Sequence, residues 1–313
     1  MFGSSGNGDQ AGGGLVGLYG KVRAQPDFLR TNAGEFSQAG LDLWFQEAVE
    51  ALRGEGTHVP ESPTSFLLAT AKLPLAFVGS FAPSADAASR SFPLVVFRSL
   101  PLRDLVDTFP SATSAYAPFV GDAGMLAFMG ADLAGPDLVA RVQALATGRG
   151  AEGPRAEAPM ADESARALLD AVGSSAALGY ALRTFTSACD QAQKTGPGGR
   201  SGVVVTVDAP APNASVRAFW LEIARRRLRW RDAVPSLVWT DGPAGRLLIT
   251  LGYATSGALC LLANPAHRAS RFWPLRTQVS TAVDSAMNAL TPEQRRCVEN
   301  PRATLGELTT AFS

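Results

Sequence analysis

The fold is decided by the stretch SFLLATAKLPLAFVGSFAPSADAASRSFPLVVF, residues 65–97. It contains three short apolar runs, at residues 65–71, 75–81 and 92–97, which are rich in Phe, Leu or Val and bounded by Pro, Gly or Ser. Short apolar segments with such boundaries are typical of strands that are buried within a sheet. We therefore predict three buried strands here, with the rest of the chain arranged around them.

The residues before this stretch predict a further strand and a helix. Residues 16–22 mix apolar and aromatic side chains and can start the sheet. Asn32 belongs to a residue type that caps helices. The apolar residues that follow it recur at helical spacing: Phe36, Leu41, Trp44, Phe45, Ala48 and Leu52. We expect one helix over these residues, capped by Asn32.

The second half of the chain alternates helical and strand-like segments. Apolar residues recur at helical spacing over residues 162–193 and again over 214–230, and the segment between them predicts a strand at 203–207. Two more strands are expected at 236–240 and 246–251. Helices that alternate with strands indicate the α/β class. We predict a layered mixed sheet flanked by helices, in two lobes.

Two capping-box patterns predict two short helices at the end of the chain. Thr291 is followed by Pro292 and Gln294, and Thr304 is followed by Glu307. In a capping box, the Ser or Thr side chain and the Glu or Gln three residues later each accept a hydrogen bond from the other residue's backbone N–H group.

Two segments without apolar periodicity suggest the domain organisation. Residues 1–14 are rich in Gly and carry only one charged side chain, so we expect a flexible leader without the features of a signal peptide. Residues 148–161 combine Gly, Pro, Ala and charged residues, as linkers do. The predicted folded units are an N-terminal domain at 15–147 and a C-terminal α/β lobe at 162–313.

The composition argues against several classes of partner. Lys plus Arg and Asp plus Glu both total 28, so the formal net charge is zero and offers no global attraction for nucleic acid or an anionic membrane. The most apolar stretches are interrupted by Lys, Pro or Gly, so membrane insertion is not expected. We expect a cytoplasmic protein with no nucleic-acid partner.

The cysteines and histidines do not form a recognisable reactive pattern. Cys189, Cys260 and Cys297 are odd in number and widely spaced, which indicates reduced, buried thiols more than a disulfide framework. His58 and His267 lie in no HxxxH, HxH or CxxC context, so we predict no metal site. The Gly-rich segments match neither a P-loop nor a dinucleotide fingerprint, so no cofactor is predicted.

One stretch of the chain is densely basic. The favoured interpretation is a solvated helix end whose positive charges suit the helix dipole, and the alternative is a binding site for nucleic acid or protein. Its residues are Arg225, Arg226, Arg227, Arg229 and Arg231, interleaved with Trp220, Leu228 and Trp230.

The segment GLYGKVRAQPDFLR, residues 17–30, resembles the opening of TagF (ImpM) family proteins, which have an aromatic Gly-Lys strand and then a Gly-Asp-Phe-hydrophobic-Arg motif. Pro26 stands where that family usually has Gly. A Trp-bearing helix with Trp44 follows in the same order. A later block is similar to the family's Asp, Gly-Arg and Phe-Pro-Leu positions, and it consists of Asp86, Arg90, Phe92, Pro93 and Leu94. Residues 235–242, which include Trp239, resemble a further family block.

The resemblance implies an α/β layered fold and a cytosolic regulator of the type VI secretion system. Such proteins act after translation, usually as repressors, through protein partners such as the forkhead-associated scaffold of that system. The resemblance brings no catalytic, cofactor-binding or metal-binding residue with it. The sequence therefore predicts a non-enzymatic accessory protein that binds other secretion components.

The matched blocks supply the candidate partner-binding residues. The polar residues of the matched blocks are Lys21, Asp27, Arg30 and Arg90. They have two possible explanations: an ion pair between an Asp and an Arg that stabilises the fold, or an exposed binding patch near the end of the first strand. Two other functions stay open: a structural subunit of the secretion apparatus, and a hydrolase whose site is assembled from Asp86, Arg90 and Cys189. The candidates are Lys21, Asp27, Phe28, Arg30, Asp86, Arg90 and Trp239.

Overall fold

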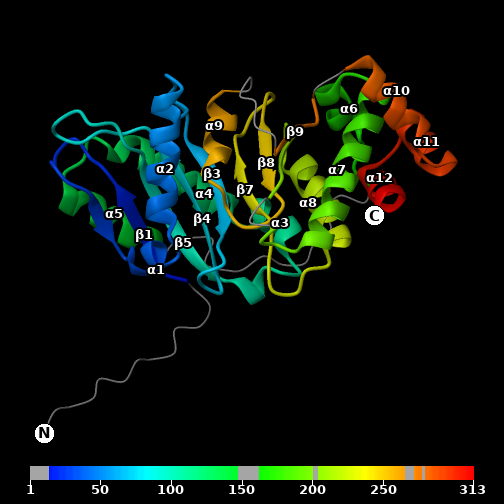
Figure 1. The fold of residues 1–313 in the computed structure, drawn as a ribbon. Helices are drawn as coiled ribbons and strands as arrows, with labels where there is room; N and C mark the ends of the chain where they lie inside the picture. Colours follow the sequence, from blue (N-terminus) through cyan, green and yellow to red (C-terminus); the bar gives the residue numbers. More distant parts are fainter. Residues whose placement is uncertain (1–13, 147–161, 200–203, 265–270, 277–278) are drawn as a thin grey trace, which may run out of the picture.

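The computed structural model describes residues 14–146, 162–199, 204–264, 271–276 and 279–313. Nine strands form one sheet in the order β2-β1-β5-β4-β3-β7-β8-β6-β9, and helices cover both of its faces (Figure 1). All neighbouring strands are antiparallel except β6 and β9, which are parallel. The predicted α/β fold with a layered mixed sheet is confirmed.

The strands confirm the three apolar runs, with small shifts at their ends. β3, β4 and β5 are central strands of the sheet, and nearly all of their residues are buried. The nine strands are β1 (Val16–Gly20), β2 (Leu29–Thr31), β3 (Thr64–Ala69), β4 (Leu75–Ala82), β5 (Leu94–Pro101), β6 (Thr206–Pro210), β7 (Ser236–Trp239), β8 (Arg246–Thr250) and β9 (Phe272–Pro274).

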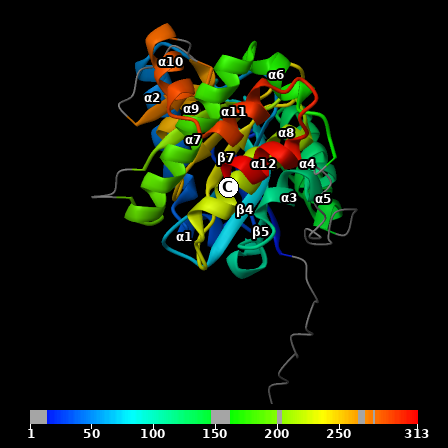
Figure 2. The ribbon, with the colours of Figure 1, turned by 90° about the vertical axis from the view of Figure 1, so that its right-hand side faces the viewer.

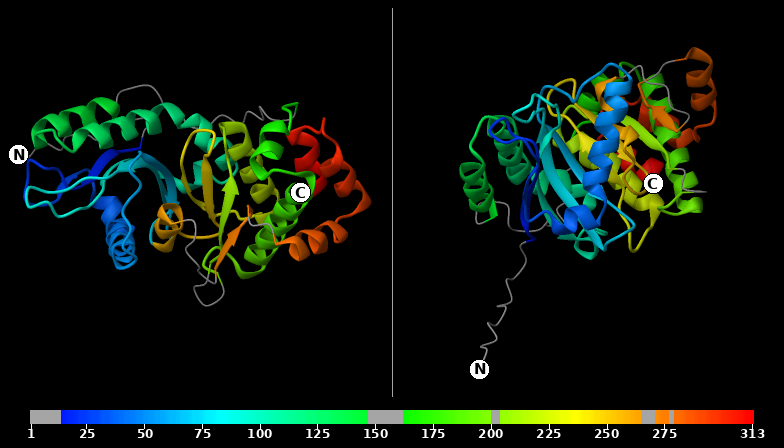
Figure 3. Two further views of the ribbon diagram at one scale, coloured as in Figure 1. Left: turned by 90° about the horizontal axis from the view of Figure 1, so that it is seen from above. Right: turned by 60° about the vertical axis from the view of Figure 1, so that its left-hand side comes forward.

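The helices lie on two sides of the sheet and in an outer layer. Seen from above, α2 and α9 lie on one side of the strands and α4 and α5 on the other (Figure 3). The C-terminal helices α11 and α12 lie against α7 and α8 (Figure 2). The helices are α1 (Gly34–Gln38), α2 (Leu41–Gly54), α3 (Phe109–Ala115), α4 (Ala117–Gly130), α5 (Gly135–Ala146), α6 (Arg166–Val172), α7 (Ser175–Thr195), α8 (Ala214–Leu228), α9 (Gly257–Ala263), α10 (Ser280–Asn288), α11 (Pro292–Glu299) and α12 (Leu305–Phe312).

An aromatic core fills the space between the sheet and helices α1, α2 and α9. Successive side chains of a strand point to opposite faces, so Phe77 and Phe81 of β4 join this core, whereas Val78 points to the other face. Phe36 of α1 is fully buried, and its ring stacks on Phe97 of β5 at a centroid distance of 4.3 Å. These rings anchor α1 and α2 to the sheet.

The second core lies on the opposite face and joins the two halves of the sequence. β3 pairs with β7, so Ser65 lies opposite Trp239. The hydroxyl of Ser236 accepts a hydrogen bond from the backbone N–H of Ala69 at 3.2 Å and lies 3.3 Å from the Ala69 carbonyl oxygen, to which it donates. Both predicted lobes thus contribute strands to one sheet, and their division into separate folded units stays a prediction.

The single helix predicted after Asn32 is wrong. Two helices occupy this stretch, because the chain turns at Gly40, whose φ of 80° lies in the left-handed region that favours glycine. Asn32 caps neither helix; the residue before α1 is Ala33, and the Asn32 side-chain amide donates a hydrogen bond to the Val16 carbonyl at 2.8 Å. The Asn32 side chain therefore ties β2 to β1.

Both predicted capping boxes are confirmed. Thr291 with Gln294 begins α11, and Thr304 with Glu307 begins α12.

The predicted leader, apart from residue 14, lies outside the described residues, as do the predicted linker and His267.

The described parts of the chain include no helix long and apolar enough to cross a membrane. All three cysteines carry free thiols; Cys189 and Cys260 are buried as predicted, and Cys297 is half-buried. Among the described residues, no group of three or more His, Cys, Asp or Glu side chains could hold a metal ion.

We predict that Phe36→Ala destabilises the protein by about 3–5 kcal/mol, because it leaves a cavity in the aromatic core. The neighbouring Leu43→Ala change removes a side chain that is 53% exposed and should change stability by less than about 0.5 kcal/mol. Urea denaturation followed by circular dichroism measures both. Equal midpoints for the two variants would contradict this assignment of the core.

Candidate functional site

Asp86 is the centre of a cluster of charges, the Asp86 cluster, which consists of the buried Lys21 and Asp86 and the exposed Arg90. Lys21 follows the last residue of β1, and Asp86 and Arg90 lie in the loop between β4 and β5. The Asp86 carboxylate is fully buried and accepts hydrogen bonds from Lys21 Nζ at 2.8 Å and Arg90 Nε at 2.7 Å. The predicted pairing of Asp and Arg within the motif set is therefore present, with Lys21 as a second partner.

Backbone groups complete the coordination of this carboxylate. The N–H groups of Ala88 and Arg90 each donate to Asp86 Oδ1 at 2.9 Å. The hydrogen bond from Lys21 and those from the loop hold the pKa of Asp86 well below its usual range, despite the opposing effect of burial. A general base needs a pKa near the working pH, so the environment of Asp86 suits a permanent anion.

The same loop is tied to the segment after β1 by three further hydrogen bonds. Arg90 Nη2 donates to the Pro26 carbonyl at 2.6 Å, Ser84 Oγ donates to the Lys21 carbonyl at 2.7 Å, and the Ala87 N–H donates to the Gln25 carbonyl at 2.9 Å. The Asp86 cluster thus fixes the path of the chain between β1 and β2.

Aromatic rings and cations lie next to the cluster. Phe28 stacks on Tyr19 at a centroid distance of 5.2 Å and contacts Phe92 edge-on at 4.8 Å. The Arg30 guanidinium lies 5.5 Å from the centre of the Tyr19 ring and 5.8 Å from that of Phe28. Burial raises the pKa of Tyr19, whose hydroxyl accepts a hydrogen bond from Gln46.

Four of the matched residues form the surface of this region, which we call the motif surface: Asp27, Phe28, Arg30 and Arg90. The Asp27 and Arg30 side chains are exposed, Phe28 is half-buried, and the Arg90 side chain is 62% exposed. Arg30 belongs to β2, the edge strand of the sheet. In the described part of the chain, Arg30 has no carboxylate within ion-pair distance, so its charge is available to a partner.

Trp239 does not join the other candidates. It lies on β7, which three strands separate from β1 in the sheet order, and is 2% exposed. Asp27 lies near the cluster but accepts only the N–H of Phe28, at 2.7 Å, among the described residues. Trp239 packs in the core, and Asp27 is a surface residue.

The family model for the TagF N-terminal domain, described as type VI secretion system-associated, matches residues 17–145. Residues 17–145, less than half of the chain, thus carry the TagF N-terminal domain. The TagF domain contains the whole Asp86 cluster and the motif surface. The protein is thus associated with type VI secretion.

Two other comparisons accompany this match. No curated protein matches the chain. The chain is similar to PA0076 from Pseudomonas aeruginosa PAO1, whose crystal structure has 18% sequence identity and a TM-score of 0.45, with 82% of this chain and 96% of that chain covered.

The hydrolase site considered from the sequence does not assemble in this protein. Asp86 and Arg90 lie in the TagF domain, whereas Cys189 is a fully buried residue of α7 at the other end of the sheet (Figure 1). Burial raises the pKa of the Cys189 thiol, whereas a nucleophilic cysteine needs a lowered one. These three residues therefore cannot act on one substrate.

Sequence reasoning missed two residues of this region of the TagF domain. Tyr19 supplies the ring on which Phe28 and Arg30 lie, and its place beside the Gly20-Lys21 pair of the motif could have indicated it. Ser84, which binds the Lys21 carbonyl, stands 63 residues from Lys21, and no local pattern marks it.

We predict that Asp86→Asn destabilises the TagF domain at neutral pH, because the Asn amide keeps an acceptor for the backbone N–H groups but leaves the Lys21 ammonium unpaired. The pKa of Asp86 is lowered on folding, so the carboxylate contributes stability above the unfolded value of about 3.9 and loses it as pH falls below that value.

The difference in unfolding free energy between wild type and Asp86→Asn should therefore be constant from about pH 7 to pH 5 and shrink at lower pH. Urea titrations at a series of pH values measure it. A difference that stays the same down to the acid limit would contradict the proposed charge pairing.

Proposed function

We propose that this protein is a non-enzymatic regulator of the type VI secretion system that binds other components of the system in the cytoplasm and represses it after translation. The observation that carries the proposal is that some motif residues of the TagF domain are buried and paired, whereas another is exposed. Lys21 and Asp86 are buried and satisfied by each other, whereas Arg30 stands exposed on an aromatic support. Such an arrangement suits binding and offers no acid–base pair.

The motif surface has the chemistry of a protein-binding site. Arg and aromatic residues are enriched at the centres of interfaces, because they bury large areas and make directional hydrogen bonds. Tyr19 and Phe28 restrict the Arg30 side chain before binding, which lowers the entropy that a partner must overcome. We expect a partner with a carboxylate opposite Arg30, and the forkhead-associated scaffold of the system is the proposed candidate.

We predict that Arg30→Glu abolishes this binding while the protein stays folded, because the change reverses an exposed charge and leaves the Asp86 cluster intact. The measurement is affinity purification of the tagged protein from its own cells, with mass spectrometry of the secretion components that it retains. Arg302→Glu, at an exposed site in the C-terminal tail, makes the same change of charge and should retain every partner.

Unchanged recovery of secretion components with Arg30→Glu would overturn the role of the motif surface. Stoichiometric recovery with the baseplate would instead favour a structural subunit of the apparatus, and a secretion assay on the Arg30→Glu strain distinguishes the two. A repressor that cannot bind should raise secretion, whereas a defective structural subunit should lower it.

A further inference from the structure

Helix α4 of the TagF domain exposes a group of large apolar side chains. Met125, Phe128 and Met129 are 57%, 54% and 58% exposed. They stand three and four residues apart, so they lie on one face of the helix. The other exposed large apolar residues of the described chain lie singly in other parts of the fold. Single apolar residues are normal on a surface, whereas a contiguous group of them marks an interaction site.

The packing of α4 on the sheet does not need these side chains. Ala123 and Ala127 are buried in the core on this face of the sheet, and a Cβ atom added at Gly124 would lie 3.5 Å from the Ser80 side chain of β4. Ser80 Oγ also donates a hydrogen bond to the Val120 carbonyl at 2.8 Å. Small residues thus let α4 approach the sheet closely, on the side away from α2 (Figure 3). The large apolar side chains are left on the opposite face of the helix, where the fold does not use them.

The surroundings of this face are acidic. Between Arg103 and Arg141 the sequence contains five Asp residues and no Lys, Arg or His. Asp122 is exposed on the same face of α4 and has no hydrogen bond or ion pair among the described residues. Asp132 follows the helix and pairs with Arg23 at 2.6 Å, but both side chains are exposed, and such a surface pair is weak. A chain of zero net charge therefore carries a local excess of negative charge around an apolar face.

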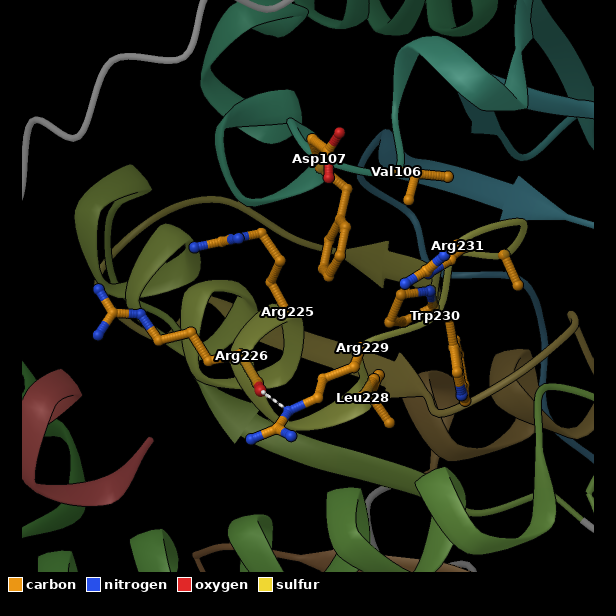
Figure 4. Close-up of a pocket in the computed structure, with 11 residues that line it drawn as sticks. Val106, Asp107, Arg225, Arg226, Leu228, Arg229, Trp230 and Arg231 are labelled. Atoms are coloured by element: carbon orange, nitrogen blue, oxygen red, sulfur yellow. Dashed lines mark hydrogen bonds between the residues drawn. The ribbon is translucent and has the colours of Figure 1, made fainter.

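The dense basic stretch of the chain does not cover this face. It lies at the end of α8, where Arg225, Arg226, Arg229 and Arg231 line a pocket of about 270 Å³ together with Asp107 (Figure 4). No residue of α4 lines that pocket. The basic stretch therefore does not supply the positive charge that would complement α4.

We propose that the exposed face of α4, formed by Asp122, Met125, Phe128 and Met129, is a docking surface for a basic amphipathic helix of another protein. The partner helix places apolar residues, spaced three and four positions apart, against Met125 and Phe128, and its flanking Lys and Arg residues pair with Asp122. Methionine side chains are flexible and polarisable, so they adapt to the apolar residues of the partner.

The size of the face favours a single helix over a second copy of this chain. Three half-exposed side chains offer on the order of 300 Å² of apolar surface, whereas a stable dimer buries roughly 800 Å² on each partner. The face of α4 shares no residue with the motif surface, so the inference is independent of the role proposed for Arg30.

The test is fluorescence anisotropy of a labelled synthetic helix, the peptide LKKLLKLLKKLLKL, titrated with the full chain. Wild type should bind it saturably, and the acidic counterpart LEELLELLEELLEL should not bind. The double change Met125→Gln with Met129→Gln removes apolar contact and should weaken binding at least about tenfold. Asp122→Lys should weaken binding at low salt and have less effect at high salt, because salt screens exposed charges. The matched control Leu43→Gln changes a side chain of α2 that is 53% exposed and should bind like wild type.

The changed side chains are exposed, so each variant should keep the circular dichroism spectrum and unfolding temperature of wild type. The proposal is overturned if wild type shows no saturable binding, if the double variant binds as tightly as wild type, or if the acidic peptide binds as tightly as the basic one. Sedimentation velocity tests a second copy as the occupant. A dimer that the double change dissociates would also overturn the proposal, whereas an unchanged sedimentation coefficient supports it.

Discussion

The pairing of β3 with β7 is the contact on which the rest of the fold depends. It joins residues 64–69 to residues 236–239, so that strands from both halves of the chain become neighbours in one sheet. Because buried backbone N–H and C=O groups must be paired, separation of these strands would expose polar groups along two central edges and open both cores at once.

Within the TagF domain, the buried carboxylate of Asp86 holds two loops together through its hydrogen bonds. A buried charge is tolerated only when it is paired and hydrogen-bonded, and Asp86 obtains its partners from Lys21 and from its own loop. The cluster positions the segment that leads to β2, and so it determines where Arg30 stands. Among the motif residues, Lys21 and Asp86 thus position the loop, whereas Arg30 is exposed on the motif surface.

The arginines of the basic stretch at the end of α8 also differ in whether they have partners within the protein. Arg227 donates hydrogen bonds to Asp190 of α7 and to the Phe312 carbonyl near the C-terminus, and Arg225 and Arg226 share Glu222. This much agrees with a helix end whose positive charges suit the dipole. Arg229 and Arg231 are not explained in this way, because neither is paired with a carboxylate among the described residues and Arg229 has a positive φ.

The sequence by itself determined the central strands, the two C-terminal helix starts and the likeness of the first half to the TagF N-terminal domain, because apolar runs, capping boxes and the motif at residues 17–30 are local patterns. Only the tertiary structure decided which groups meet. Lys21 pairs with a carboxylate 65 residues away, Asn32 binds β1 and caps no helix, and Trp239 is buried on β7, which three strands separate from β1. Local propensity carries no information about such partners, because strand order and packing across the sheet bring them together.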